Sequence, residues 1–292
     1  MLPYPEGFQR YTLTNGDLVP EVIQHYYSLP LLNLGTLMGL LSTQDNSGYT
    51  QYLTALQSVG RWKSGDSPVK TFKGENVLEH VASGVHLIGT VMQLFPELAR
   101  VADLQKAADY FFLHDGGEIA VDDMANTDPR WSNLNALQKT QLQAEKEAKE
   151  QRGFETQVVT IFGTNFQSMV SGTYLQYEQR VTLAAHFAKW IDVIVGNRIA
   201  LDRFYPERTH QSAERILTIA LAKFYATSQI VLNKLRDKIR VQEDPENVYQ
   251  EAVRQFLILV GVYQQEFVRC GYRTEVESYR ENYPQLVGLL NG

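Results

Sequence analysis

The sequence predicts an all-α fold. Apolar residues recur at spacings of three and four along most of the chain, no segment of useful length alternates apolar and polar residues, and Gly or Pro ends several of the periodic segments. The chain has 292 residues, of which 44% are hydrophobic, so it is long enough to bury a substantial core. We therefore expect a bundle of helices.

The overall charge restricts the possible partners. The formal charge is −6, with 27 Lys+Arg against 33 Asp+Glu, which argues against binding a nucleic-acid polymer but permits a small anionic substrate. A single cysteine, Cys270, excludes an intramolecular disulfide and a Cys-based zinc site. The first residues lack the pattern of a signal peptide, and the apolar stretch 29–41 is shorter than the ~18–20 residues that span a bilayer. We expect a cytoplasmic protein without a membrane segment.

The first half of the chain is predicted to form short helices followed by two longer ones. A helix over 50–59 ends at Gly60, and the basic loop 61–73 leads directly into a helix over 74–94. A further helix from about residue 99 delivers His114 and Asp115 at its carboxyl end, where two glycines break it.

The second half contains a polar helix over 134–151, which we expect to be solvated, and two helices within 154–204 that meet near Arg180. Asp192 lies beside the apolar stripe of the second of these. Helices over 211–241 and 245–270 are predicted to form a hairpin that packs on the rest of the chain or on a second subunit.

His80, His114, Asp115 and Asp192 are the candidate metal ligands. Neighbouring residues of a helix diverge by about 100°, so the His-Asp pair can share one ion only at the end of its helix, between crossing helices. A carboxylate at a buried edge needs compensation, and a shared cation would provide it. This mixed nitrogen and oxygen set suits one ion of Mn, Fe, Co, Zn or Mg. The other histidine of the first helix, His86, points to a different face.

Other polar residues near the candidate ligands could transfer protons or bind substrate. Glu118 follows His114 by four residues and is a candidate general acid/base if the helix continues past the glycines. Asp122 and Asp123 come one turn later, and they either bind substrate hydroxyls or form a solvated acidic loop. Arg61 is suited to bidentate phosphate binding. Two lysines of the same loop, Lys63 and Lys73, are further candidates for contact with the phosphate.

Five segments in this order resemble the HD-domain metal-dependent phosphohydrolases, and most closely the YfbR-like 5′-deoxynucleotidases. They are Arg61-Trp62, ENVLEH at 75–80, HDGGE at 114–118, Asp123 and AHFAKWID at 185–192.

The resemblance implies an HD-domain core over 57–205, an amino-terminal helical extension over 1–56 and the carboxyl-terminal hairpin over 206–292. It also implies a homodimer with one divalent metal ion per site, bound by the four candidate ligands.

The resemblance further implies roles for individual residues in phosphate-ester hydrolysis. Glu118 would be the catalytic acid/base for attack of metal-bound water on phosphorus, and Arg61 would hold the phosphate. Trp62 would pack on the sugar and disfavour a ribose 2′-hydroxyl, while Asp123 would bind the 3′-hydroxyl. Lys63 would assist Arg61.

Three alternative functions remain open. HD enzymes that hydrolyse deoxynucleoside triphosphates share these ligands, and a non-catalytic scaffold that binds nucleotide or metal is compatible with the long flanking helices. HD-type di-iron oxygenases need further histidines between the His-Asp pair and the last aspartate, where this chain has only His186.

Overall fold

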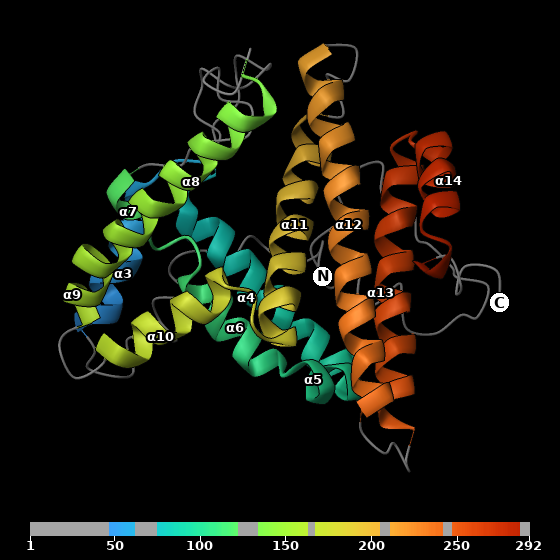
Figure 1. Ribbon diagram of the computed structural model, residues 1–292, viewed down its shortest axis with the longest axis horizontal. Coiled ribbons are helices and arrows are strands. Elements are labelled where there is room, and N and C mark those ends of the chain that lie inside the picture. The colour runs from blue at the N-terminus through green and yellow to red at the C-terminus, as the bar shows by residue number, and fades with distance from the viewer. Residues whose placement is uncertain are drawn as a thin grey trace, which may run out of the picture.

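The computed structural model describes residues 47–61, 75–121, 134–162, 167–204, 211–241 and 247–286. Within these ranges every named element is helical, and the only β-type pairing is a single antiparallel bridge between Gly60 and Asn76. The predicted all-α class is therefore confirmed (Figure 1).

The longer helices form two groups. One consists of α11, α12 and α13, which run side by side, with α14 next to α13; α3, α8, α9 and α10 lie on the other side of the molecule (Figure 1). Helices α4, α5 and α6 connect the two groups. The bounds are α3 Ser47–Ser58, α4 Val77–Leu94, α5 Pro96–Ala102, α6 Leu104–Leu113, α7 Glu118–Val121, α8 Ala136–Gly153, α9 Val159–Phe162, α10 Gln167–Glu178, α11 Leu183–Phe204, α12 Gln211–Val241, α13 Val248–Arg269 and α14 Arg273–Asn282.

The start of α4 is capped and joined to the end of α3. Asn76 accepts a hydrogen bond from the backbone N–H of Glu79, whose side chain in turn accepts one from the Asn76 N–H, each at 2.9 Å. The backbone N–H of Arg61 donates to the Glu75 carbonyl at 2.7 Å. These contacts place Arg61 beside the first turn of α4.

The prediction of a single helix from about residue 99 to His114 is wrong, because the structure has two helices there. Asp103 separates α5 from α6 with a left-handed φ of 51°, and its side chain accepts a hydrogen bond from the Lys106 N–H. Short polar residues tolerate this conformation and cap the helix that follows.

The α-helical conformation does not continue from His114 to Glu118. Residues 114–117 form a turn in which the N–H groups of Gly116 and Glu118 donate to carbonyls three residues earlier. Glu118 instead begins the short helix α7. The premise of a continuous helical face from His114 to Glu118 is therefore wrong, although the two residues remain close in sequence.

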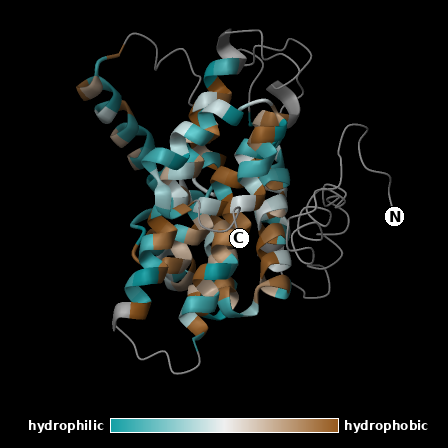
Figure 2. Cartoon of the chain, turned by 90° about the vertical axis from the view of Figure 1, so that its right-hand side faces the viewer, coloured by the Kyte–Doolittle hydropathy of each residue, from teal (hydrophilic) through white to brown (hydrophobic). Residues whose placement is uncertain are grey.

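The later helices agree with the sequence pattern. Helices α10 and α11 meet at Arg180, whose φ of 51° produces the break, and α12 and α13 occupy the predicted hairpin ranges. The polar helix α8 extends further than expected, through a π-helical turn over Phe154–Val158 into α9. Helix α8 is rich in Gln, Lys and Glu. Figure 2 shows hydrophobic residues gathered toward the inside of the bundle.

The main hydrophobic core joins α4, α5 and α6 to α11–α14. A smaller one lies between α3, the start of α4, the π-helical turn, α9 and α10. Trp190 is fully buried in the main core, and its indole N–H donates to the Ser228 hydroxyl at 2.8 Å. This hydrogen bond holds α11 against α12. Since Asp192 lies on the same helix, the position of its carboxylate depends on this packing.

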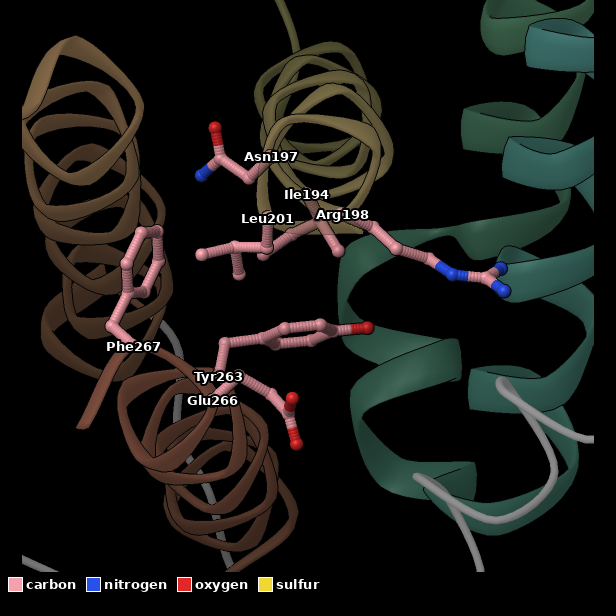
Figure 3. A pocket seen from close by; sticks show the side chains of 7 residues that line it. All are labelled: Ile194, Asn197, Arg198, Leu201, Tyr263, Glu266 and Phe267. Carbon is pink, nitrogen blue, oxygen red and sulfur yellow. The ribbon is translucent and has the colours of Figure 1, made fainter. Parts of the chain in front are cut away.

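One described helix, over residues 214–239 of α12, is long and apolar enough to cross a membrane by length and composition alone. Half of its most apolar window is buried inside the protein, and a single helix of this kind is weak evidence for a membrane span. A small pocket lies between α11 and α13 (Figure 3). Two polar residues that line the pocket have partners inside the protein. Glu266 accepts a hydrogen bond from Arg269 at 2.5 Å, and Asn197 donates one to the Ala220 carbonyl at 3.1 Å.

Candidate metal centre

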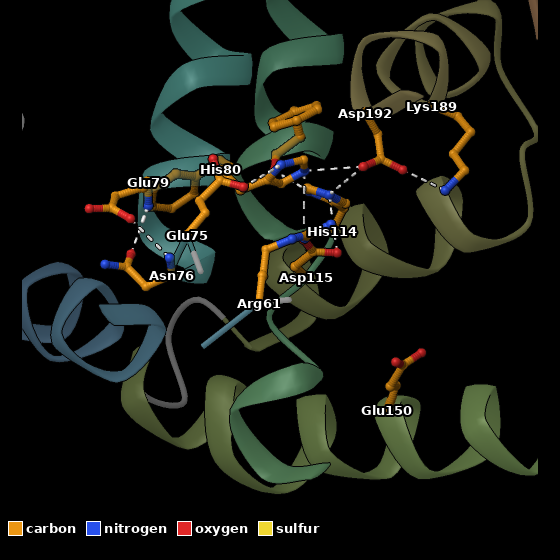
Figure 4. A network of polar contacts seen from close by, with 12 residues as sticks. Arg61, Glu75, Asn76, Glu79, His80, His114, Asp115, Glu150, Lys189 and Asp192 are labelled. Atoms are coloured by element: carbon orange, nitrogen blue, oxygen red, sulfur yellow. Dashed lines mark hydrogen bonds and ion pairs between the residues drawn. The ribbon is translucent and has the colours of Figure 1, made fainter. Parts of the chain in front are cut away.

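Three helices bring His80, His114 and Asp192 together. His80 lies in the first turn of α4, His114 caps the carboxyl end of α6, and Asp192 lies in the first half of α11 (Figure 4). One ligand atom from each of them lies within 4.8 Å of the other two. Both histidines are buried, and the Asp192 side chain is 14% exposed.

The Asp192 carboxylate joins the two imidazoles. Its Oδ1 lies 3.1 Å from His80 Nε2 and 3.7 Å from His114 Nε2. Its Oδ2 pairs with Lys189 Nζ at 2.5 Å, one turn earlier on α11. Lys189 thus holds the carboxylate with Oδ1 toward the imidazoles, a role that the sequence pattern alone did not assign.

Asp115 lies at the side of this group. Its Oδ1 is 3.1 Å from His114 Nε2 and its Oδ2 is 3.8 Å from His80 Nε2. The same Oδ2 forms an ion pair with Arg61 Nη1. The structure therefore brings all four predicted ligands into contact, but in this conformation Asp115 also contacts the residue predicted to hold phosphate.

Hydrogen bonds orient the two imidazoles. His114 Nδ1 lies 2.6 Å from the Phe111 carbonyl, which can only accept, so Nδ1 carries a proton and Nε2 faces the carboxylates. His80 Nδ1 lies 3.6 Å from Glu75 Oε2, and its Nε2 likewise faces Asp192. Glu75 was part of the sequence motif, but its position behind His80 was not predicted.

Close packing fixes the rings. The Phe111 ring lies against both imidazoles, with centroids 4.4 Å from His114 and 5.6 Å from His80. A Cβ at Gly84 would lie 2.0 Å from the Phe111 ring, so the absence of a side chain on α4 makes room for it. Phe111 therefore positions His114 with both its carbonyl and its ring.

The charges of the centre alter its proton affinities. Burial on its own would lower the pKa of His114, but Asp115 and Asp192 raise it to about 9. The pKa of His80 is also raised, because Asp192 and Glu75 outweigh the opposing effects of burial and Arg61. Burial opposes ionisation of Asp192, yet Lys189 and the two imidazoles hold the pKa of this carboxyl well below its usual value.

This donor set fits a divalent cation. His114 Nε2 is buried and makes no hydrogen bond of ordinary geometry within the described residues, and it points at carboxylate oxygens. Without a metal, protonated imidazoles lie beside the Asp115 and Asp192 carboxylates, which also pair with Arg61 and Lys189. Exchange of those protons for a divalent ion would preserve the charge balance, and imidazole with carboxylate suits Mn, Fe, Co or Zn.

We expect metal affinity to rise with pH. A metal ion must displace the proton of His114 at any pH below about 9, so affinity should increase by up to about tenfold per pH unit for each imidazole proton displaced. In the metal-free protein the sign is opposite. The stabilisation from protonated His114 is complete below its ordinary pKa of about 6.5 and is lost as the pH rises through about 9.

Calorimetric titration with Mn²⁺ between pH 6.5 and 8.5, in buffers of different ionisation enthalpy, measures both the affinity and the protons released. Affinity that does not change over this range, with no proton release, would show that the imidazoles are not the ligands.

The remaining predicted site residues differ in what the structure describes. Trp62, Lys63 and Asp123 lie outside the described residues, as does Asp122. The Glu118 side chain is buried, with its residue 6% exposed, and its backbone N–H donates to the Asp115 carbonyl at 3.0 Å.

The comparisons with known proteins agree with this geometry. A family model described as HD domain matches residues 54–238, which is more than half of the chain and includes most of α12. The matched range contains His80, His114, Asp115 and Asp192. Comparison with curated proteins and with solved structures gives no match.

Proposed function

The chain belongs to the HD domain family, whose members are in general metal-dependent phosphohydrolases, and we propose that it hydrolyses the phosphate ester of a small nucleotide. A deoxynucleoside 5′-monophosphate is the first candidate, because the motifs around Arg61 and HDGGE resemble those of 5′-deoxynucleotidases. A deoxynucleoside triphosphate is the second candidate, since enzymes of both kinds share these ligands.

The observation that carries the proposal is the convergence of His80, His114 and Asp192 from three separate helices. These residues, with Asp115, would hold one divalent cation. Such an ion lowers the pKa of bound water and neutralises charge on a phosphoryl group. The Phe111 carbonyl and Lys189 keep His114 and Asp192 in the orientation required for binding.

Two further residues are assigned to the substrate. Arg61 lies at the edge of the centre, where its pairing with Asp115 orients the guanidinium beside the ligands. A guanidinium has five N–H donors in a planar fork, which matches the oxygens of a phosphate. Glu118, buried and adjacent to the metal-ligand turn, is assigned the transfer of a proton to or from the reacting groups.

The test is a panel of deoxynucleoside mono- and triphosphates with Mn²⁺, Co²⁺ and Mg²⁺, assayed on the wild type beside Glu118→Gln. We expect hydrolysis by the wild type and a fall in kcat of about 10²- to 10⁴-fold in the variant, the range for removal of a general acid or base. Metal affinity should be unchanged, because Glu118 is not among the proposed ligands. A wild type inactive on every substrate would refute the proposal.

The panel also separates the alternative functions. If the wild type binds metal and nucleotide but hydrolyses no substrate, and Glu118→Gln changes neither kind of binding, a binding scaffold explains the protein better. Two iron ions per chain, measured by metal analysis, would instead favour a di-iron oxygenase.

A further inference from the structure

Tyr177 carries a buried hydroxyl that lacks a hydrogen-bond partner within the described residues. The residue lies near the end of α10 and is 2% exposed. Its ring packs edge-on against His114, with centroids 5.4 Å apart. An unpaired buried hydroxyl lowers stability, so it calls for an explanation.

The other equally buried tyrosines differ from Tyr177. Each of the three donates its hydroxyl hydrogen to a nearby oxygen. The pairs are Tyr52 with the Phe112 carbonyl at 3.0 Å, Tyr110 with Gln176 Oε1 at 2.7 Å, and Tyr225 with the Val276 carbonyl at 3.3 Å. Within this set, the unpaired hydroxyl belongs to the tyrosine that packs against a candidate metal ligand.

The position of Tyr177 is fixed from two sides. The Arg180 guanidinium lies 3.7 Å from the ring centroid, and its Nη1 donates to the Tyr177 carbonyl. His114 contacts the ring from another side. Burial raises the pKa of Tyr177 well above its ordinary value; Arg180 opposes this, and the nearby Asp192 and Asp115 carboxylates raise the pKa further. The hydroxyl therefore remains a hydrogen-bond donor at all physiological pH values.

We propose that the Tyr177 hydroxyl is a substrate-binding donor that hydrogen-bonds a phosphate oxygen at the metal centre. This inference rests on the proposed function, because it assumes that a phosphate group occupies the centre. A phosphate oxygen accepts hydrogen bonds and, being charged, makes strong ones. The ligand-free protein then carries the cost of an unsatisfied donor, and binding of phosphate supplies the acceptor.

The substitution Tyr177→Phe tests this, because it removes only the hydroxyl oxygen. We expect the metal-free variant to melt at the same temperature as the wild type or higher, since an unpaired polar group is lost. Its affinity for Mn²⁺ should be unchanged. The affinity of the Mn²⁺-loaded protein for inorganic phosphate, measured by calorimetry, should fall about 10- to 100-fold, as for loss of a hydrogen bond to a charged group.

The matched control is Tyr225→Phe, which removes a paired hydroxyl whose ring stacks on Tyr279 of α14. It should lower the melting temperature and leave phosphate affinity unchanged. Phosphate affinity within twofold of wild type in Tyr177→Phe would overturn the inference, and so would a loss of Mn²⁺ affinity. If the wild type hydrolyses no phosphate ester while Tyr177→Phe still weakens phosphate binding, the role of the hydroxyl stands and the proposed hydrolase function fails.

Discussion

Replacing Asp192 by asparagine is expected to abolish metal binding and, with it, phosphate-ester hydrolysis. Asp192 Oδ1 is the oxygen closest to the two imidazoles together, at 3.1 and 3.7 Å from their Nε2 atoms. Asparagine keeps the shape of the side chain but removes the charge that attracts a cation. Loss of a residue that only supports a ligand costs about 10- to 100-fold in metal affinity or activity, so loss of a ligand itself should cost more. Calorimetric titration with Mn²⁺ measures the affinity directly.

The metal-free form of Asp192→Asn provides a second measurement. Asp192 helps raise the pKa values of His80 and His114, so both should fall in the variant, as followed by NMR titration of the imidazoles. Asp109→Asn is the control, because Asp109 is an exposed acid on α6, the helix that His114 caps. That variant should bind metal like the wild type. Metal affinity in Asp192→Asn equal to that of the control would show that another group of residues forms the site.

The features of the fold that follow helical periodicity were predictable from the sequence. A helix places residues on a face according to its period, so the buried faces of α4 and α11 could be located and Asp192 identified beside an apolar stripe. The breaks were harder to place. Periodicity continues through Asp103, and the break there depends on a left-handed backbone and a capping hydrogen bond that involve single residues.

The contacts between helices could not be obtained from the pattern. A periodic face shows which side of a helix is buried, but not its rotation to within one residue or its distance from a neighbour. The pairing of Arg61 with Asp115, the position of Glu75 behind His80 and the unpaired hydroxyl of Tyr177 all depend on those quantities. The candidate ligands could be named from the sequence because their chemistry is distinctive, whereas the residues that support them are of common types.

Gly117→Ala is expected to destabilise the protein and to impair catalysis without removing a single functional atom. A Cβ at Gly117 would lie 2.5 Å from the backbone oxygen of Glu150 in α8. A backbone atom inside a helix cannot move aside cheaply, so α7 and α8 would have to separate. Overpacking of this kind costs about 1–3 kcal/mol of unfolding free energy. Denaturant titration measures this loss.

The expected loss of activity in Gly117→Ala arises from Glu118, the residue that follows Gly117. Glu118 follows Gly117 directly, so displacement of α7 should move the Glu118 side chain and lower kcat. Gly89→Ala is the control: Gly89 lies inside α4, and a Cβ there has no atom within 4 Å. This change should stabilise the protein by about 0.5–1 kcal/mol, because alanine restricts the unfolded chain more than glycine does. Equal stability of the Gly117 and Gly89 variants would mean that the close approach of α7 to α8 does not constrain the site.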